Sequence, residues 1–134
     1  MKKLLNKKNN KGFSLVELIV VVLIMGIIAV ALAPQVMKWV DKAKTNSDAN
    51  TAKDIKSALQ IAVADAKADG VAVPTVTSKN YDATDVATLG SFATYVTEVT
   101  GGDYSAKTSA GGKFTFSISS AGVVTVSYPG APTT

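Results

Sequence analysis

The residue with the clearest chemical potential is Glu17, a single carboxylate at the start of a long apolar segment. Residues 18–37, between Glu17 and Lys38, carry no charge and are rich in Val, Ile, Leu and Ala. At about 1.5 Å per helical residue this run is about 30 Å long, the thickness of the hydrocarbon core of a bilayer. An ionisable group inside a membrane segment is costly and indicates a functional role. The alternative is that Glu17 lies at the level of the lipid headgroups.

The residues around Glu17 form the segment Lys11-Gly12-Phe13-Ser14-Leu15-Val16-Glu17-Leu18. This segment closely resembles the prepilin signature of type IV pilins and of the pseudopilins of type II secretion. The resemblance covers residues 7–40, and the rest of the chain is similar only in general layout. It implies that a membrane-embedded prepilin peptidase cuts between Gly12 and Phe13, and that the new N-terminal Phe13 is methylated. Gly12 lacks a Cβ, which lets a peptidase approach the backbone closely.

The resemblance also implies an assembly role for Glu17 and Phe13. A lone carboxylate in hydrocarbon costs several kcal/mol, and the Phe13 amine of a neighbouring subunit could supply the missing cation. We hypothesise that such a pair sets the register between subunits. In some systems buried polar or ionic groups confer this kind of specificity. Pairing with the amine of the same chain is the rival arrangement, and it would carry no assembly information.

Gly26 and Pro34 interrupt the apolar segment. Inside a helix, Pro34 removes a backbone hydrogen bond at a cost of about 3 kcal/mol, and Gly26 adds roughly 1 kcal/mol. In the pilin family the equivalent segment can stretch or melt when subunits pack into a filament, so we expect these two residues to loosen the helix there. The alternative is a simple kinked membrane anchor.

The basic charge of the chain is concentrated before the apolar segment. The first twelve residues hold five lysines and no acidic residue, which leaves nine lysines against ten acidic residues in the remainder. The formal charge of +4 therefore gives no argument for a nucleic-acid-binding surface. A lysine cluster beside a spanning segment keeps that end in the cytoplasm. We predict a leader over residues 1–12 that is removed, and a transmembrane and filament-core helix over residues 13–37 with the following residues outside.

An ordinary secretory signal peptide is a competing interpretation, because Ala31-Leu32-Ala33 is a possible signal peptidase site. Three features weigh against it. Pro34 would follow the cut directly, Glu17 interrupts the start of the apolar region, and that region is longer than the usual 7–15 residues or so.

Residues 38–69 are predicted to continue the helix as an amphipathic half. From Gln35 onward, small and apolar residues recur at intervals of three and four: Val36, Val40, Ala43, Ser47, Thr51, Ile55, Ala58, Ala62 and Ala66. Residues 45–51 are mostly poor helix formers, so we expect a loosened turn at that point. Gly70 suits the position that follows a helix C-terminus. A continuous helix over residues 13–69 would be about 85 Å long.

Residues 70–134 have the composition of a small head domain. Residues 71–82 are expected to form an extended crossing loop, and Asp85 to N-cap one short helix that ends at Gly101-Gly102. Residues 113–119 and 124–128 alternate as two strands of a hairpin, and residues 104–108 are predicted to be a third strand. The apolar faces of the hairpin carry Phe114, Phe116 and Ile118 opposite Val124, Val126 and Tyr128. We expect this sheet to pack on the helix around Ile55, Leu59 and Val63, because about 64 residues cannot bury a large core alone.

The composition excludes several kinds of chemistry. The chain has no His, Cys or Arg, so disulfides, thiolate or imidazole metal ligands and a nucleophile paired with a His base are excluded. Asp82, Asp85 and Asp103 could offer oxygens to Ca²⁺, as major pseudopilins do with a C-terminal loop. Their scattered positions favour solvated loop acids instead, and we expect neither a metal nor a cofactor.

The sequence therefore predicts an α+β protein in which a long N-terminal helix packs against a small antiparallel sheet. The function that the resemblance implies is structural and not enzymatic: a major pilin precursor that is cleaved, N-methylated and polymerised into an extracellular type IV pilus. Its expected partners are further copies of itself, the prepilin peptidase, the inner-membrane assembly machinery and, before assembly, the cytoplasmic membrane. A pseudopilin of a type II secretion system and a single-pass membrane protein with an external binding head are the alternatives.

Overall fold

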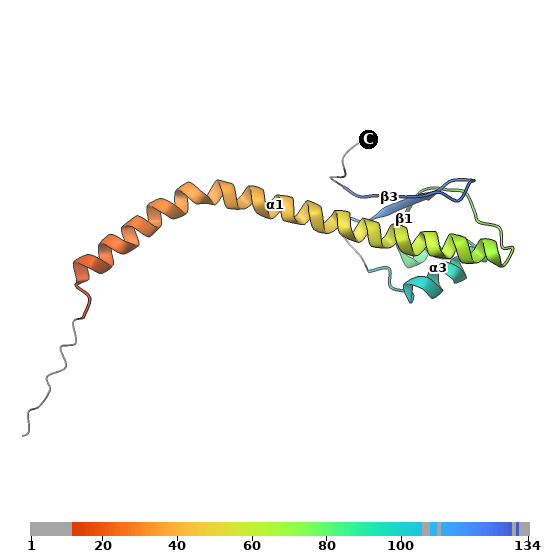
Figure 1. Ribbon diagram of the computed structural model, residues 1–134, viewed down its shortest axis with the longest axis horizontal. Helices are drawn as coiled ribbons and strands as arrows, with labels where there is room; N and C mark the ends of the chain where they lie inside the picture. Colours follow the sequence, from red (N-terminus) through yellow and green to blue (C-terminus); the bar gives the residue numbers. More distant parts are fainter. Residues whose placement is uncertain (1–11, 106–107, 110, 130, 132–134) are drawn as a thin grey trace, which may run out of the picture. The chain divides into compact units, whose positions relative to one another are not determined.

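The computed structural model describes residues 12–105, 108–109, 111–129 and 131 of the 134-residue chain. The leader segment predicted over residues 1–12 therefore lies outside the described residues, apart from Gly12. The fold is the predicted α+β arrangement of a long N-terminal helix and a small antiparallel sheet, as in pilins (Figure 1). The chain divides into two compact units, one up to Val40 and one from Asp41 onward, and each is described here by itself.

The first unit is an exposed apolar helix. Helix α1 covers Leu15–Ala68 and begins in this unit. All described residues up to Val40 are exposed, including large side chains such as Leu23 and Ile27. The segment is long and apolar enough to cross a membrane, with a mean hydropathy of 3.1 over its most apolar 18 residues. The helix runs on through Gly26 and Pro34 without a break.

The part of α1 in the second unit turns one face toward the core. Its buried residues are Asp48, Ala52, Ile55, Leu59, Ala62, Val63 and Ala66. From Ile55 onward the predicted stripe is buried at Ile55, Ala62 and Ala66, and Ala58 is half-buried. Before Ile55 the prediction was wrong, since Val36, Val40 and Ala43 are exposed. Asp48 and Ala52 are buried in place of Ser47 and Thr51, because the Asp48 carboxylate is bound by a loop of the head.

The loosened turn predicted for residues 45–51 is also wrong, since this stretch is regular α-helix. The hydroxyls of Thr45 and Thr51 donate to the carbonyls of Asp41 and Ser47, both at 3.1 Å. Each hydroxyl thus shares the carbonyl four residues earlier with the helical backbone, and the two lone pairs of that oxygen allow the helix to continue.

The C-terminus of α1 is closed at Gly70, as predicted. Gly70 has φ +71°, a left-handed conformation that glycine adopts without strain. The Val71 N–H donates to the Ala66 carbonyl at 2.8 Å, and the Gly70 N–H donates to the Lys67 carbonyl at 3.2 Å. This pair of bonds is the Schellman motif. Two side chains at this end of α1 bind the rest of the head. Lys67 donates to the Ala121 carbonyl, and Asp69 accepts from the Tyr95 hydroxyl.

The sheet has three antiparallel strands in the order β1-β2-β3. Strands β2 (Thr115–Ile118) and β3 (Val124–Ser127) form the predicted hairpin, with Phe116 opposite Val126 and Ile118 opposite Val124. The third strand is β1 (Val76–Asn80), which lies within the stretch that we expected to be an unpaired crossing loop.

The strand predicted over residues 104–108 is not found. Of its described residues, Tyr104, Ser105 and Thr108 are in no strand, and residues 106–107 lie outside the description.

The reason that β1 was missed is its composition. It is Val-Thr-Ser-Lys-Asn, with one buried side chain and a register irregularity between Val76 and Lys79. Ser78 in this irregular stretch has φ +48° and donates its N–H to the Ser117 hydroxyl at 3.0 Å.

Two short helices stand in place of the single predicted one. Helix α2 covers Ala83–Ala87 and helix α3 covers Phe92–Thr100. Asp82, and not Asp85, is the N-cap of α2, since its side chain accepts from the Asp85 N–H at 2.8 Å. Gly90, at φ +63°, lies in the turn between the two helices. The predicted stop is confirmed, because Gly101 caps α3 in a left-handed conformation.

The core of the second unit forms where α1, the sheet and the two short helices meet (Figure 1). Its largest fully buried side chains are Phe92, Phe114, Phe116, Leu59 and Ile118. The predicted contact surface on α1 is confirmed, because Ile55, Leu59 and Val63 all belong to this core. The part of α1 in the second unit is therefore a structural part of the head.

Candidate functional site

The predicted cleavage junction lies just outside α1. Gly12, Phe13 and Ser14 have no regular secondary structure, and the helix begins at Leu15. Phe13 is 92% exposed. A Cβ built on Gly12 would meet no other described atom within 4 Å. The peptide bond between Gly12 and Phe13 is thus in open, non-helical backbone, a form that a peptidase can bind without first unwinding a helix.

Ser14 is the N-cap of α1. Its carbonyl accepts the first helical hydrogen bond, from the Leu18 N–H at 3.1 Å. Its own N–H donates to Oε2 of Glu17 at 2.8 Å. A carboxylate three residues after the N-cap that binds back to the N-cap N–H is half of a capping box. It also suits the positive end of the helix dipole.

This partner of Glu17 is the functional feature that the sequence analysis missed. The signal was present as Ser14-Leu15-Val16-Glu17 directly before an apolar run, which is the S-x-x-E pattern of a capping box.

The surroundings of Glu17 are otherwise apolar. Phe13, Leu18 and Val21 line a shallow hollow on the helix surface together with Glu17. Among the described residues, Oε1 of Glu17 has no hydrogen-bond partner, whereas Oε2 is bound by Ser14. A carboxylate can accept more than two hydrogen bonds. The arrangement therefore leaves one oxygen available to a cation.

Gly26 and Pro34 lie on the same exposed helix. A Cβ built on Gly26 would meet no described atom within 4 Å. Packing within the described chain therefore does not require a glycine at this position. The loosening role expected for Gly26 and Pro34 stays a prediction.

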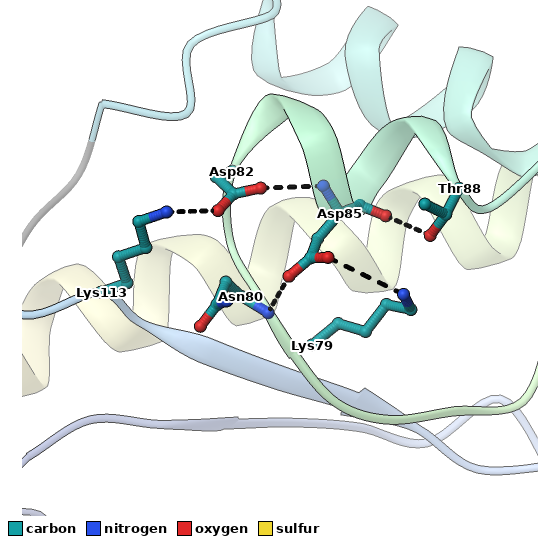
Figure 2. A network of polar contacts seen from close by, with 6 residues as sticks. All are labelled: Lys79, Asn80, Asp82, Asp85, Thr88 and Lys113. Atoms are coloured by element: carbon teal, nitrogen blue, oxygen red, sulfur yellow. Dashed lines mark hydrogen bonds and ion pairs between the residues drawn. The ribbon is translucent and has the colours of Figure 1, made fainter.

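Charged side chains of the head gather at the start of α2 (Figure 2). Oδ2 of Asp82 accepts from the Lys113 ammonium at 2.6 Å. Asp85 accepts from the Asn80 N–H at 2.9 Å and lies 3.8 Å from the Lys79 ammonium. The hydrogen bond from Lys113, followed by that from the Asp85 N–H, holds the pKa of Asp82 below its ordinary value. The same contact with Asp82 raises the pKa of Lys113.

These acids do not form a metal site with Asp103. Asp82 and Asp85 are bound by lysines and backbone N–H groups, and Oδ1 of Asp103 accepts from the N–H and hydroxyl of Ser105. These bonds lower the pKa of Asp103. In the part of the chain that the structure describes, no three acidic side chains are placed to hold a metal ion together. The charged cluster at α2 joins β1, α2 and the segment before β2.

A second polar contact joins α1 to the loop before β2. Oδ1 of the buried Asp48 accepts from the N–H of Ser109 at 2.7 Å and from its hydroxyl at 2.8 Å. The neighbouring Thr108 is also buried, and its hydroxyl accepts from the Gly112 N–H at 2.9 Å. The loop is thus closed on itself at Thr108 and held to the helix at Asp48.

Comparison with known proteins agrees with the features of the N-terminal segment. Residues 7–33 match the family described as the prokaryotic N-terminal methylation motif. Over 57 residues, the chain is 39% identical to the type II secretion system core protein G of Pseudomonas aeruginosa. That region is 42% of this chain and 40% of the relative, so the chain spans less than half of the length of the curated relative that it matches. No solved structure matches the chain.

Proposed function

We propose, from the premise that this chain carries a prepilin-type N-terminus on a pilin-like α+β fold, that it is a structural subunit of a filament. More narrowly, we infer a major pilin precursor that is polymerised into an extracellular type IV pilus and has no catalytic role. The observation that carries the proposal is the junction itself. A glycine and an exposed phenylalanine lie outside the helix, directly before Glu17 and a membrane-length apolar run.

The proposed path begins at the cytoplasmic membrane, with the lysine-rich end in the cytoplasm and the head outside. The prepilin peptidase cuts between Gly12 and Phe13, and Phe13 is methylated. The inner-membrane assembly machinery then transfers the subunit from lipid into the filament. The apolar side chains of α1, which are all exposed up to Val40, exchange their contact with lipid for contact with other copies of α1.

Glu17 is the residue that we propose to guide this transfer. In the membrane its carboxylate is surrounded by Phe13, Leu18 and Val21 and lacks a cation among the described residues. The Phe13 amine of a second copy, displaced by one step along the fibre, would supply that cation. Removing both charges from lipid together then favours the registered arrangement over others.

A pseudopilin of a type II secretion system is the second candidate. It is favoured by the 39% identity to the core protein G of such a system. The absence of a calcium-type acidic loop among the described residues favours a pilus, because Asp82 and Asp85 are bound by lysines instead. A membrane-anchored protein with an external binding head is the third candidate.

Isolation of surface fibres tests this choice. We expect the protein to be the main component of long fibres sheared from intact cells. A pseudopilin would stay in the membrane fraction, and its deletion would block export through the type II secretion system. A monomeric anchored protein would be absent from fibres, and its deletion would leave such export unchanged.

Mass spectrometry of the mature protein tests the processing step. We expect a chain that begins at a methylated Phe13. A mature chain that begins at Pro34 would show that residues 1–33 are an ordinary secretory signal and would overturn the proposal.

A further inference from the structure

The hydrogen bond between Ser14 and Glu17 has a consequence for assembly. A glutamate side chain has three rotatable bonds, and fixing it in one conformation costs rotamer entropy. In this structure one conformation is already selected, because Oε2 lies 2.8 Å from the Ser14 nitrogen. A group that is ordered before its partner arrives does not incur that cost on binding.

The donor in this bond carries no formal charge. An N–H group orients the carboxylate and satisfies one oxygen, but it leaves the negative charge to be balanced by another group. Oε1 has no hydrogen-bond partner in the described part of the chain. The two oxygens therefore differ. Oε2 is bound by the Ser14 N–H and holds the side chain in place, whereas Oε1 can still bind a cation.

We propose that the backbone N–H of Ser14 is a positioning group for the assembly carboxylate. It holds Glu17 back over the first turn of α1 and leaves the second oxygen for a cation from another copy of this chain. The inference rests on the proposed function for its assembly step, whereas the hydrogen bond itself belongs to the single subunit. Ser14 acts here through its backbone, so its hydroxyl is not required.

The first experiment measures the Ser14 amide in the full precursor in detergent micelles by NMR. Glu17→Gln keeps a side-chain oxygen that can accept from Ser14, since Gln also serves in capping boxes. Glu17→Ala removes the acceptor. We expect hydrogen exchange of the Ser14 amide to be about tenfold faster in Glu17→Ala than in the natural chain, with Glu17→Gln close to the natural chain. Equal exchange in all three proteins would overturn the proposal.

The second experiment measures assembly with substitutions of Ser14 itself. Ser14→Pro removes the N–H and is compatible with a helix start, whereas Ser14→Ala keeps the N–H and removes the hydroxyl. Sheared fibre is divided by mature subunit in the membrane, so that a change in cleavage is not counted as a change in assembly. We expect fibre yield to fall several-fold in Ser14→Pro and to stay unchanged in Ser14→Ala. Equal yields from the two variants would contradict the positioning role.

The two experiments separate the inference from the function that it extends. If the natural chain forms no fibres, the proposed function fails, while the amide measurement still decides whether Ser14 holds Glu17. That measurement uses the uncleaved precursor, so it remains decisive if Ser14→Pro is a poor peptidase substrate.

Discussion

Ser109 binds the buried carboxylate of Asp48 from 61 residues further along the chain, through both its N–H and its hydroxyl. The Ser109 hydroxyl also lies 3.3 Å from the Lys44 carbonyl. Ser109 thus binds both a side chain and a backbone carbonyl on one turn of α1. The contact lies at the N-terminal end of the buried stripe of α1, where the apolar core no longer covers the helix.

Asp48→Ala should destabilise the head by about 1–3 kcal/mol, because it removes a charged acceptor of two hydrogen bonds. All four tyrosines, at positions 81, 95, 104 and 128, lie in the second unit. Thermal unfolding of the detergent-solubilised protein, followed by the near-ultraviolet circular dichroism of tyrosine, therefore reports on the head. Asp65→Ala, at an exposed position on the same helix, is the matched control. Equal melting of the two variants would show that the contact with Ser109 contributes nothing.

The ion pair of Asp82 and Lys113 should make head stability depend on pH at both extremes. The pKa of Asp82 is lowered in the folded state. Its contribution is therefore present above its ordinary value of 3.8 and is lost as pH falls through the lower folded value. The pKa of Lys113 is raised. Its contribution is thus complete below its ordinary value of 10.5 and is lost as pH rises through the raised value.

Lys113→Met tests this linkage. Urea unfolding should show a smaller fall in stability between neutral pH and pH 3 in Lys113→Met than in the natural chain. Asp82→Asn is a useful second variant, because its amide oxygen can still accept from the Asp85 N–H and keep the cap of α2. Parallel pH profiles for the natural chain and Lys113→Met would exclude the ion pair as a source of stability.

Glu17→Ala should abolish fibre formation while membrane insertion and cleavage stay largely unaffected, since the apolar run and the Gly12-Phe13 junction are unchanged. Glu17→Gln should also fail to assemble, because it keeps the bond to Ser14 but has no charge to pair with an amine. Fibre yield, membrane fractionation and the size of the mature protein measure the three steps separately. Abundant fibres from either variant would reduce Glu17 to an interfacial residue.

Gly26 and Pro34 should mark the part of α1 that changes on assembly. The isolated subunit is helical throughout this segment, and we expect residues 26–34 to lose helical hydrogen bonds in a filament. A filament map by electron cryomicroscopy checks this directly, and an ordered helix through the segment would contradict it. Pro34→Ala restores a backbone N–H and should stiffen the anchor without blocking cleavage.

The sequence predicted those parts of the fold that rest on strong periodic patterns. The long helix, its stop at Gly70, the hairpin with Phe116 opposite Val126 and the core contact at Leu59 were all found. Each follows from apolar spacing over many residues or from a glycine at a left-handed position. The prepilin-type N-terminus was also recognisable, because its motif combines several residue types in a fixed order.

Two of the features that were missed depend on partners distant in sequence, and a third was a local choice between neighbouring residues. Strand β1 has a single buried side chain and an irregular register, so its pairing with β2 leaves little trace in its composition. Asp48 has the composition of a solvent-facing helix residue, and only Ser109 explains its burial. The cap of α2 at Asp82 instead of Asp85 was a choice between two aspartates three residues apart, which propensity alone does not decide.

The buried stripe of α1 has a consequence for the order in which the chain can fold. Leu59 and Ala62 are fully buried, and the core to which they belong includes Phe114, Phe116, Ile118 and Val124 of the hairpin region. In the orientation that we propose, with the lysine-rich end in the cytoplasm and the head outside, this stripe would cross the membrane before the strands that share its core. The head would then complete its core only after the hairpin has crossed.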